Sequence, residues 1–153
     1  MPLRILHVLG GLGRGGAESM VMNLYRHIDR KMVQFDFVIY EDGKLDFYDE
    51  IISLGGQVFK SPHYHGINTF EYVKFWNKFL TFHPEYRVVH GHVRSTASIY
   101  LSIARKKGCK TIAHSHSTSN GTGISALAKK FLQYPIRLIS DYQMACSLEA
   151  GKW

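Results

Sequence analysis

Short apolar runs rich in β-branched residues alternate with longer amphipathic stretches along nearly the whole chain. This alternation is typical of a parallel sheet, because each helix carries the chain back to the edge where the next strand begins. The expected strands are residues 4–9, 35–40, 57–60, 87–90, 110–114 and 143–147. The expected helices are residues 17–29, 46–54, 69–82, 95–107 and a stretch from Ile124 that Pro135 should break or kink. We therefore predict a three-layer, Rossmann-like α/β domain with a mainly parallel sheet.

The length of 153 residues suits one well-buried domain and is too short for two of ordinary size. We expect residues 1–147 to form this domain and residues 148–153 to begin a helix that the chain leaves unfinished at Trp153. Such an ending indicates a truncated chain. No apolar run approaches the roughly 18 residues that cross a bilayer, and no export signal is evident, so a cytoplasmic protein is expected.

Five of the seven residues from 10 to 16 are glycine, directly after the first expected strand. Glycine lets the backbone turn tightly and approach a ligand, and the N-terminus of the following helix offers free N–H groups to a phosphate. The residues expected to lie against a diphosphate are Gly11, Gly13, Arg14, Gly15 and Gly16. The alternative without a ligand is a tight strand-to-helix turn.

Two kinds of ligand suit this loop. Gly11, Gly13 and Gly16 match the G-x-G-x-x-G pattern of dinucleotide-binding proteins, and Glu41 after the second strand could bind a ribose hydroxyl. This interpretation predicts a stand-alone nucleotide- or dinucleotide-binding module. The other interpretation is a loop that contacts the diphosphate of a donor held mainly by another domain.

Six of the nine histidines lie at or just after the carboxyl ends of expected strands. They are His63, His65, His90, His92, His114 and His116. Because these ends share one edge of a parallel sheet, we expect the histidines to converge beside the glycine-rich loop. The H-x-H pairs could bind a metal, since side chains at i and i+2 of a strand point the same way. Residues 89–119 contain no carboxylate to support such ligands, so structural roles or a polar pocket for sugar and phosphate are favoured.

Residues 4–18, followed by Asn23-Leu24, resemble the N-terminus of bacterial glycosyltransferase family 4 enzymes, notably those of capsular and exopolysaccharide assembly. The Gly-Gly-Ala-Glu of residues 15–18 is not required by the dinucleotide pattern. The resemblance runs on to Glu149-Ala150-Gly151, which in the family leads into the segment that joins two domains. It implies the acceptor-side, N-terminal half of a GT-B fold whose donor-binding C-terminal domain is absent, so this half alone should be inactive.

The resemblance also implies a reaction and a site. Members transfer a sugar, with retention, from a nucleotide-sugar such as a UDP- or GDP-sugar to a glycan or polyprenyl-linked acceptor, and need no metal or other cofactor. His116, or else His114, is expected to contact the transferred sugar. The other residues expected to bind sugar or acceptor are His90, His92, Arg94, Ser117, Thr118, Tyr64 and His65. Because the departing diphosphate can deprotonate the acceptor, such a site needs positioning groups rather than the paired carboxylates of glycosidases.

Nineteen Lys and Arg residues against twelve Asp and Glu give a net charge of +7, which favours anionic partners. The basic residues form no single tract, so nucleic acid is not expected. The expected helix 69–82 combines aromatic residues with Lys74 and Lys78, and the stretch from Ile124 carries Lys129 and Lys130. These surfaces either pack in the core or dock on anionic lipid at the inner face of the plasma membrane.

Overall fold

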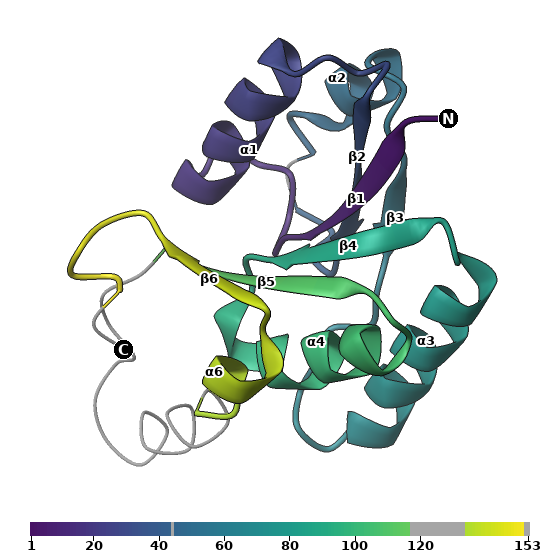
Figure 1. Ribbon diagram of the computed structural model, residues 1–153, viewed down its shortest axis with the longest axis vertical. Coiled ribbons are helices and arrows are strands. Elements are labelled where there is room, and N and C mark those ends of the chain that lie inside the picture. The colour runs from purple at the N-terminus through teal and green to yellow at the C-terminus, as the bar shows by residue number, and fades with distance from the viewer. Residues whose placement is uncertain (44, 117–133, 152–153) are drawn as a thin grey trace.

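The computed structural model describes residues 1–43, 45–116 and 134–151 (Figure 1). Within them the strands form one parallel sheet in the order β3-β2-β1-β4-β5-β6. Their bounds are β1 Leu3–Val8, β2 Val33–Ile39, β3 Val58–Lys60, β4 Tyr86–Gly91, β5 Lys110–Ser115 and β6 Tyr142–Ala145. The predicted parallel α/β architecture is confirmed, with strand ends shifted by one or two residues from those expected.

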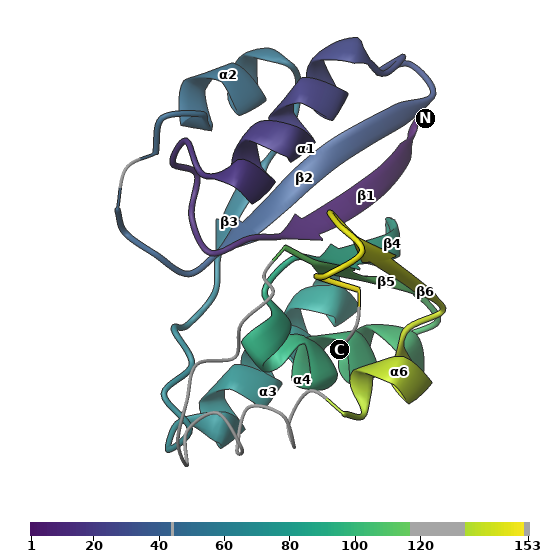
Figure 2. The ribbon, with the colours of Figure 1, turned by 90° about the vertical axis from the view of Figure 1, so that its left-hand side faces the viewer.

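Helices cover both faces of this sheet (Figures 1 and 2). Those on one side are α1 Gly16–His27 and α2 Tyr48–Ser53; those on the other are α3 Thr69–Phe82, α4 Ala97–Lys106 and α6 Ile136–Ile139. The α3 bounds are those predicted, whereas the helix expected at 95–107 divides into a 3₁₀ turn, η1 Arg94–Thr96, and α4. Among the described helices, none is long and apolar enough to cross a membrane.

The larger part of the core lies between the sheet and helices α3, α4 and α6. Because side chains alternate between the two faces of a strand, Leu6 and Val8 of β1 point into this core together with Val89 of β4. Trp76 of α3 and Tyr100 of α4 are fully buried there and stack with ring centroids 5.2 Å apart. The aromatic side chains of α3 thus serve the core on one side of the helix.

The second core lies between the sheet and helices α1 and α2. Helix α1 buries Val21 and Tyr25 against Phe35 and Phe37 of β2. Of the described residues, those in this core come from the β1–β3 half of the molecule, and β4 and β5 contribute none. On the same face β4 and β5 carry histidines instead. The second core therefore does not extend beyond β1 on this face of the sheet.

A buried ion pair joins the first two strands. The Arg4 guanidinium donates two hydrogen bonds of 2.6 Å to the Asp36 carboxylate, whose side chain is fully buried. The same carboxylate accepts a hydrogen bond of 2.7 Å from the backbone N–H of Gln57, just before β3. A charge can be buried in this way only because every part of it is paired.

The last described residues follow β6 as a turn. The Gly151 backbone N–H donates to the Ser147 carbonyl at 3.1 Å, and the Ala150 side chain is buried. The helix expected from Leu148 is a single turn over the residues that the structure describes.

Candidate functional site

The carboxyl ends of β1 and β4 lie side by side where the strand order reverses. In open α/β sheets ligands bind in the crevice at this position. The backbone N–H of His92, just after β4, donates to the Val8 carbonyl at the end of β1 at 3.0 Å. The glycine-rich loop begins at Gly10, two residues after Val8, so loop and histidines share one edge.

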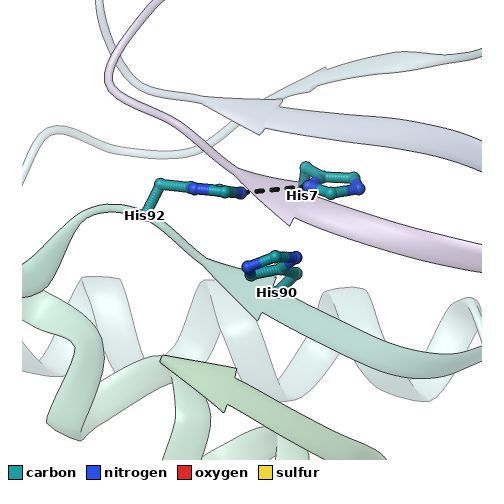
Figure 3. Close-up of side chains that lie close together, drawn as sticks. All are labelled: His7, His90 and His92. Carbon is teal, nitrogen blue, oxygen red and sulfur yellow. Dashed lines mark hydrogen bonds between the residues drawn. The ribbon is translucent and has the colours of Figure 1, made fainter. Parts of the chain in front are cut away.

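Five histidines meet at this edge, and we call them the five-histidine cluster: His7, His90, His92, His114 and His116. His7 of β1 is in register with His90 of β4. Ring nitrogens face one another at 3.0 Å between His7 Nδ1 and His92 Nε2, and at 2.8 Å between His92 Nδ1 and His116 Nε2. A third pair joins His90 Nε2 to His114 Nδ1 at 3.3 Å. Figure 3 shows the inner part, with His7 and His92 in contact and His90 beside them.

The rings of the cluster are stacked as well as hydrogen-bonded. Ring centroids lie 4.3 Å apart between His90 and His92, and 4.2 Å apart between His114 and His116. This follows from the i, i+2 spacing, which places both rings of a pair on the same face of the sheet. His7 also packs on Phe35, so the cluster continues the edge of the apolar core.

Burial keeps these imidazoles neutral. Desolvation, aided by the neighbouring histidines, lowers the pKa of His90 and of His116 to about 4. The pKa values of His7 and His92 are lowered further by burial and by the same neighbours, and desolvation lowers the pKa of His114. A neutral imidazole has one N–H donor and one acceptor nitrogen. The cluster therefore suits hydroxyl groups and metal ions, and does not attract phosphate by its charge.

The predicted convergence holds for His90, His92, His114 and His116. His63 and His65 form a separate pair among the described contacts: their rings lie 4.5 Å apart, and His63 stacks on Tyr40 at 4.7 Å.

His7 was not foreseen as a member of the cluster. The signal was its position in the first strand, which lies in the middle of a Rossmann-type sheet and therefore beside β4. A residue on that strand, on the same face as the H-x-H pairs, must meet them.

The glycine-rich loop forms one wall of a pocket of about 280 Å³. The residues lining it are Gly11, Gly13, Gly15, Glu18, Glu41 and Gly43. The loop bends at Gly10 and over residues 12–14, and the Gly10 carbonyl accepts hydrogen bonds from the Tyr40 and Glu41 N–H groups at the end of β2. Glu18 was not expected beside a diphosphate, and Glu41 was expected near this loop only in the dinucleotide-binding interpretation. Glu18 lies in the first turn of α1, where the positive end of the helix dipole favours a negative charge.

Two arginines flank these features. Arg14 is exposed and is not among the residues that line the pocket. Arg94 is partly buried in η1 and donates to Ser115 Oγ at 3.3 Å, which places it beside the end of β5. Burial lowers the pKa of Arg94, although a guanidinium remains charged at neutral pH.

Besides His65, three predicted sugar-binding residues lie elsewhere or outside the described residues. Tyr64 is tied to the start of α3, where its hydroxyl lies 3.1 Å from Thr69 Oγ1 and its ring packs on Tyr72. Ser117 and Thr118 lie outside the described residues. The sugar- and diphosphate-binding roles of the site residues stay predictions.

Residues 14–147 match the family described as Glycosyltransferase Family 4. The chain is 36% identical over 154 residues to a Bacillus subtilis (strain 168) protein named "Putative glycosyltransferase EpsF". The alignment covers 98% of this chain and 40% of that protein. The chain thus spans well under half the length of this relative.

Solved structures share the fold at low sequence identity. Anabaena HepE, crystallised with UDP, superposes with a TM-score of 0.68 and 14% identity over 98% of this chain and 39% of that one. MurG from Acinetobacter baumannii gives a TM-score of 0.61 and 10% identity over 94% of this chain and 41% of that one. These likenesses confirm the predicted fold class, a Rossmann-like half of a GT-B fold.

Proposed function

Because the chain belongs to glycosyltransferase family 4, we propose that it supplies the acceptor-side half of a retaining glycosyltransferase. The enzyme moves a sugar from a UDP- or GDP-sugar to a glycan or polyprenyl-linked acceptor during synthesis of a cell-surface polysaccharide. The HepE structures hold UDP and UDP-glucose, which supports a nucleotide-sugar donor. The observation that carries the proposal is the five-histidine cluster beside the glycine-rich loop at the reversal of strand order.

The outer histidines of the cluster bind the transferred sugar in this proposal. His116 uses Nε2 toward His92, which leaves Nδ1 for a sugar hydroxyl. His114 uses Nδ1 toward His90, which leaves Nε2. The inner rings hold these two in place, so the hydroxyl meets nitrogens whose positions are already fixed. His116 is the less buried of the two outer rings and is the primary candidate for contact with the sugar.

The diphosphate lies toward the glycine-rich loop. Glu18 occupies the positive end of α1 in the free chain, so its side chain must swing away before a phosphate can take that place. Arg14 and Arg94 supply the positive charge on either side. No carboxylate touches the cluster among the described contacts, which suits a reaction in which the departing diphosphate takes the acceptor proton.

The surface of α3 that turns away from the core supports contact with lipid. Phe70 and Phe82 are 81% and 70% exposed, and Ile67 before the helix is almost fully exposed. Lys74 and Lys78 are exposed on the same helix. We propose that this surface lies against anionic lipid at the cytoplasmic face of the membrane, where the aromatic rings insert and the ammonium groups meet head groups.

A dinucleotide-binding module is the second candidate, and one observation favours it. The Glu41 carboxylate lies beside Gly11, 3.2 Å from where a Cβ would stand, close to the place where an acidic residue binds a ribose hydroxyl in such proteins. The two candidates differ in the ligand that the isolated chain binds. A dinucleotide module binds NAD(H) or NADP(H) by itself, whereas half of a transferase binds a nucleotide-sugar weakly.

The test follows the backbone amide signals of the chain by NMR during additions of UDP-glucose, GDP-mannose and NAD⁺. We expect weak, saturable shifts of the Gly10–Gly16 amides with a nucleotide-sugar and none with NAD⁺.

A second test measures catalysis in the enzyme that contains this chain. His116→Ala should lower kcat at least about 100-fold, as does the loss of one fixed hydrogen-bond donor in other enzymes. His27→Ala, on the exposed side of α1, is the control. Tight NAD⁺ binding by the chain, or full transferase activity of the His116→Ala variant, would contradict the proposal.

A further inference from the structure

The five-histidine cluster offers more paired nitrogens than a sugar can use. Three pairs of ring nitrogens approach within 2.8 to 3.3 Å of each other. Nitrogens about 2.0–2.1 Å from a Zn²⁺ ion lie about 3.3 Å apart in a tetrahedral site. One of these pairs, His92 Nδ1 and His116 Nε2 at 2.8 Å, is therefore close enough for its two nitrogens to share one metal ion.

We propose that His92, His114 and His116 bind a divalent transition-metal ion of the Zn²⁺ class. One nitrogen from each of these rings lies within 4.8 Å of the other two. His92 directly follows β4, and on the adjacent strand β5 His114 lies within the strand and His116 directly follows it. His114 and His116 form an H-x-H pair whose rings stack on one another. Neutral imidazole, the form that burial favours here, is also the form that ligates metal.

The hydrogen bonds to His7 and His90 indicate which nitrogens of His92 and His114 would bind the metal ion. If His92 ligates through Nδ1, its Nε2–H donates to His7 Nδ1 at 3.0 Å. If His114 ligates through Nε2, its Nδ1–H donates to His90 Nε2 at 3.3 Å. Histidine ligands nearly always donate their second N–H to a fixed acceptor, and here imidazoles take the place that carboxylates usually hold. The lack of carboxylates in residues 89–119 counted against a metal site in the sequence. Because imidazoles can accept these hydrogen bonds, that lack no longer argues against one.

A second triad, His7, His90 and His92, has nitrogens equally close together. It is the less suitable site because His7 is only 1% exposed, so an ion has no short path to it. His116 lies at the partly exposed end of the cluster. The outer triad can thus admit an ion and leave its fourth position open to water or to a ligand.

This inference does not depend on the transferase activity, since it concerns binding of the ion to the chain itself. It does predict a conflict, because the metal and the sugar would both use Nε2 of His114 and would need the two different nitrogens of the one His116 ring. A bound ion therefore competes with the sugar contacts of the proposed reaction.

The experiment uses the untagged chain, freed of metal with EDTA. Zn²⁺ binding is measured by calorimetry, and Co²⁺ is added to read the coordination geometry from its visible absorption. We expect one ion per chain and a tetrahedral Co²⁺ spectrum. His116→Ala should weaken Zn²⁺ binding at least about 100-fold, since loss of an outer partner alone costs 10–100-fold. His27→Ala and His65→Ala remove histidines outside the cluster and should bind Zn²⁺ as the wild type does.

Three outcomes overturn the proposal. They are absence of saturable binding, equal loss of affinity in the control variants, and unchanged affinity in His116→Ala, which would place the ion in the inner triad. If a variant unfolds, the wild-type chain still decides, because Zn²⁺ must shift the ring NMR signals of His92, His114 and His116 and leave those of His27 and His65 in place.

Discussion

Gly91 lies so close to the ring of Tyr100 that a methyl group in its place would overlap the phenol. A Cβ there would stand 2.9 Å from two ring carbons of Tyr100 and nearer still to its hydroxyl. Tyr100 cannot retreat, because it is fully buried on α4 and its hydroxyl donates to the Val93 carbonyl at 3.1 Å. Glycine is thus required between His90 and His92, on the opposite face of β4.

We predict that Gly91→Ala lowers the free energy of unfolding by about 1–3 kcal/mol, the usual cost of overpacking a core. Urea unfolding followed by circular dichroism measures this change. Gly16→Ala is the matched control, since a Cβ at the first position of α1 meets nothing within 4 Å. Equal stability of Gly91→Ala and wild type would show that Tyr100 moves aside.

The Arg4–Asp36 pair should be needed for folding. Asp36→Asn leaves the Arg4 guanidinium beside a neutral amide, and we expect a loss of about 3–5 kcal/mol in the free energy of unfolding. Asp42→Asn removes one partner of an exposed pair with Lys60 and should change stability little. Urea midpoints of the two variants test this contrast, and comparable losses in both would refute it.

Acid should destabilise the folded chain through the five-histidine cluster. His90 and His116 have pKa values of about 4 in the folded chain, against an ordinary value of 6.5. Their contribution to stability is full above about pH 6.5, because neither state then binds the proton. It is lost as the pH falls toward 4, because only the unfolded chain takes up protons in that window.

The free energy of unfolding, measured with a chelator present, should therefore decrease from about pH 7 to about pH 5. His90→Gln removes one such group, so the slope should fall by up to about 1.4 kcal/mol per pH unit. A stability that does not vary over this range, or a slope that the substitution leaves intact, would argue against neutral, buried imidazoles.

Binding to lipid should depend on the exposed side of α3. Phe70→Ser and Phe82→Ser should each weaken binding to phosphatidylglycerol vesicles about tenfold or more, since a buried Phe contributes about 1.5–3 kcal/mol. Ile52→Ser, at an exposed apolar side chain of α2, is the control. Added salt should weaken binding further, because it screens Lys74 and Lys78. Sedimentation with vesicles measures all of these, and unaltered binding of both Phe variants would rule out this surface.

The periodicity of the sequence predicted the strands, the helices and the common edge at which the H-x-H pairs meet. Helix α3 has its predicted bounds, because Pro84 follows its end and its apolar spacing is helical throughout. The helix expected at 95–107 was wrong at its start, where Arg94 to Thr96 form a 3₁₀ turn. Periodicity does not distinguish these two kinds of turn over three residues.

The contents of the site were harder to predict than its position. His7 looked like an ordinary strand residue until strand order placed β1 beside β4. Glu18 and Glu41 both line the pocket of the glycine-rich loop, and only Glu41 was anticipated near it, from its place after the second strand. The sequence therefore suggested a cradle for anions, whereas the free chain presents carboxylates there.

The face of β4 and β5 that carries the five-histidine cluster has a further property. A bare aliphatic sheet face would be driven to associate with another copy or to aggregate in water. Imidazoles are polar and pair with one another through three nitrogen–nitrogen contacts here, although Nε2 of the buried His7 has no hydrogen-bond partner among the described residues. Only His90 and His116 of the five rings are partly exposed, so this edge presents two neutral imidazoles, rather than aliphatic side chains, to whatever binds there.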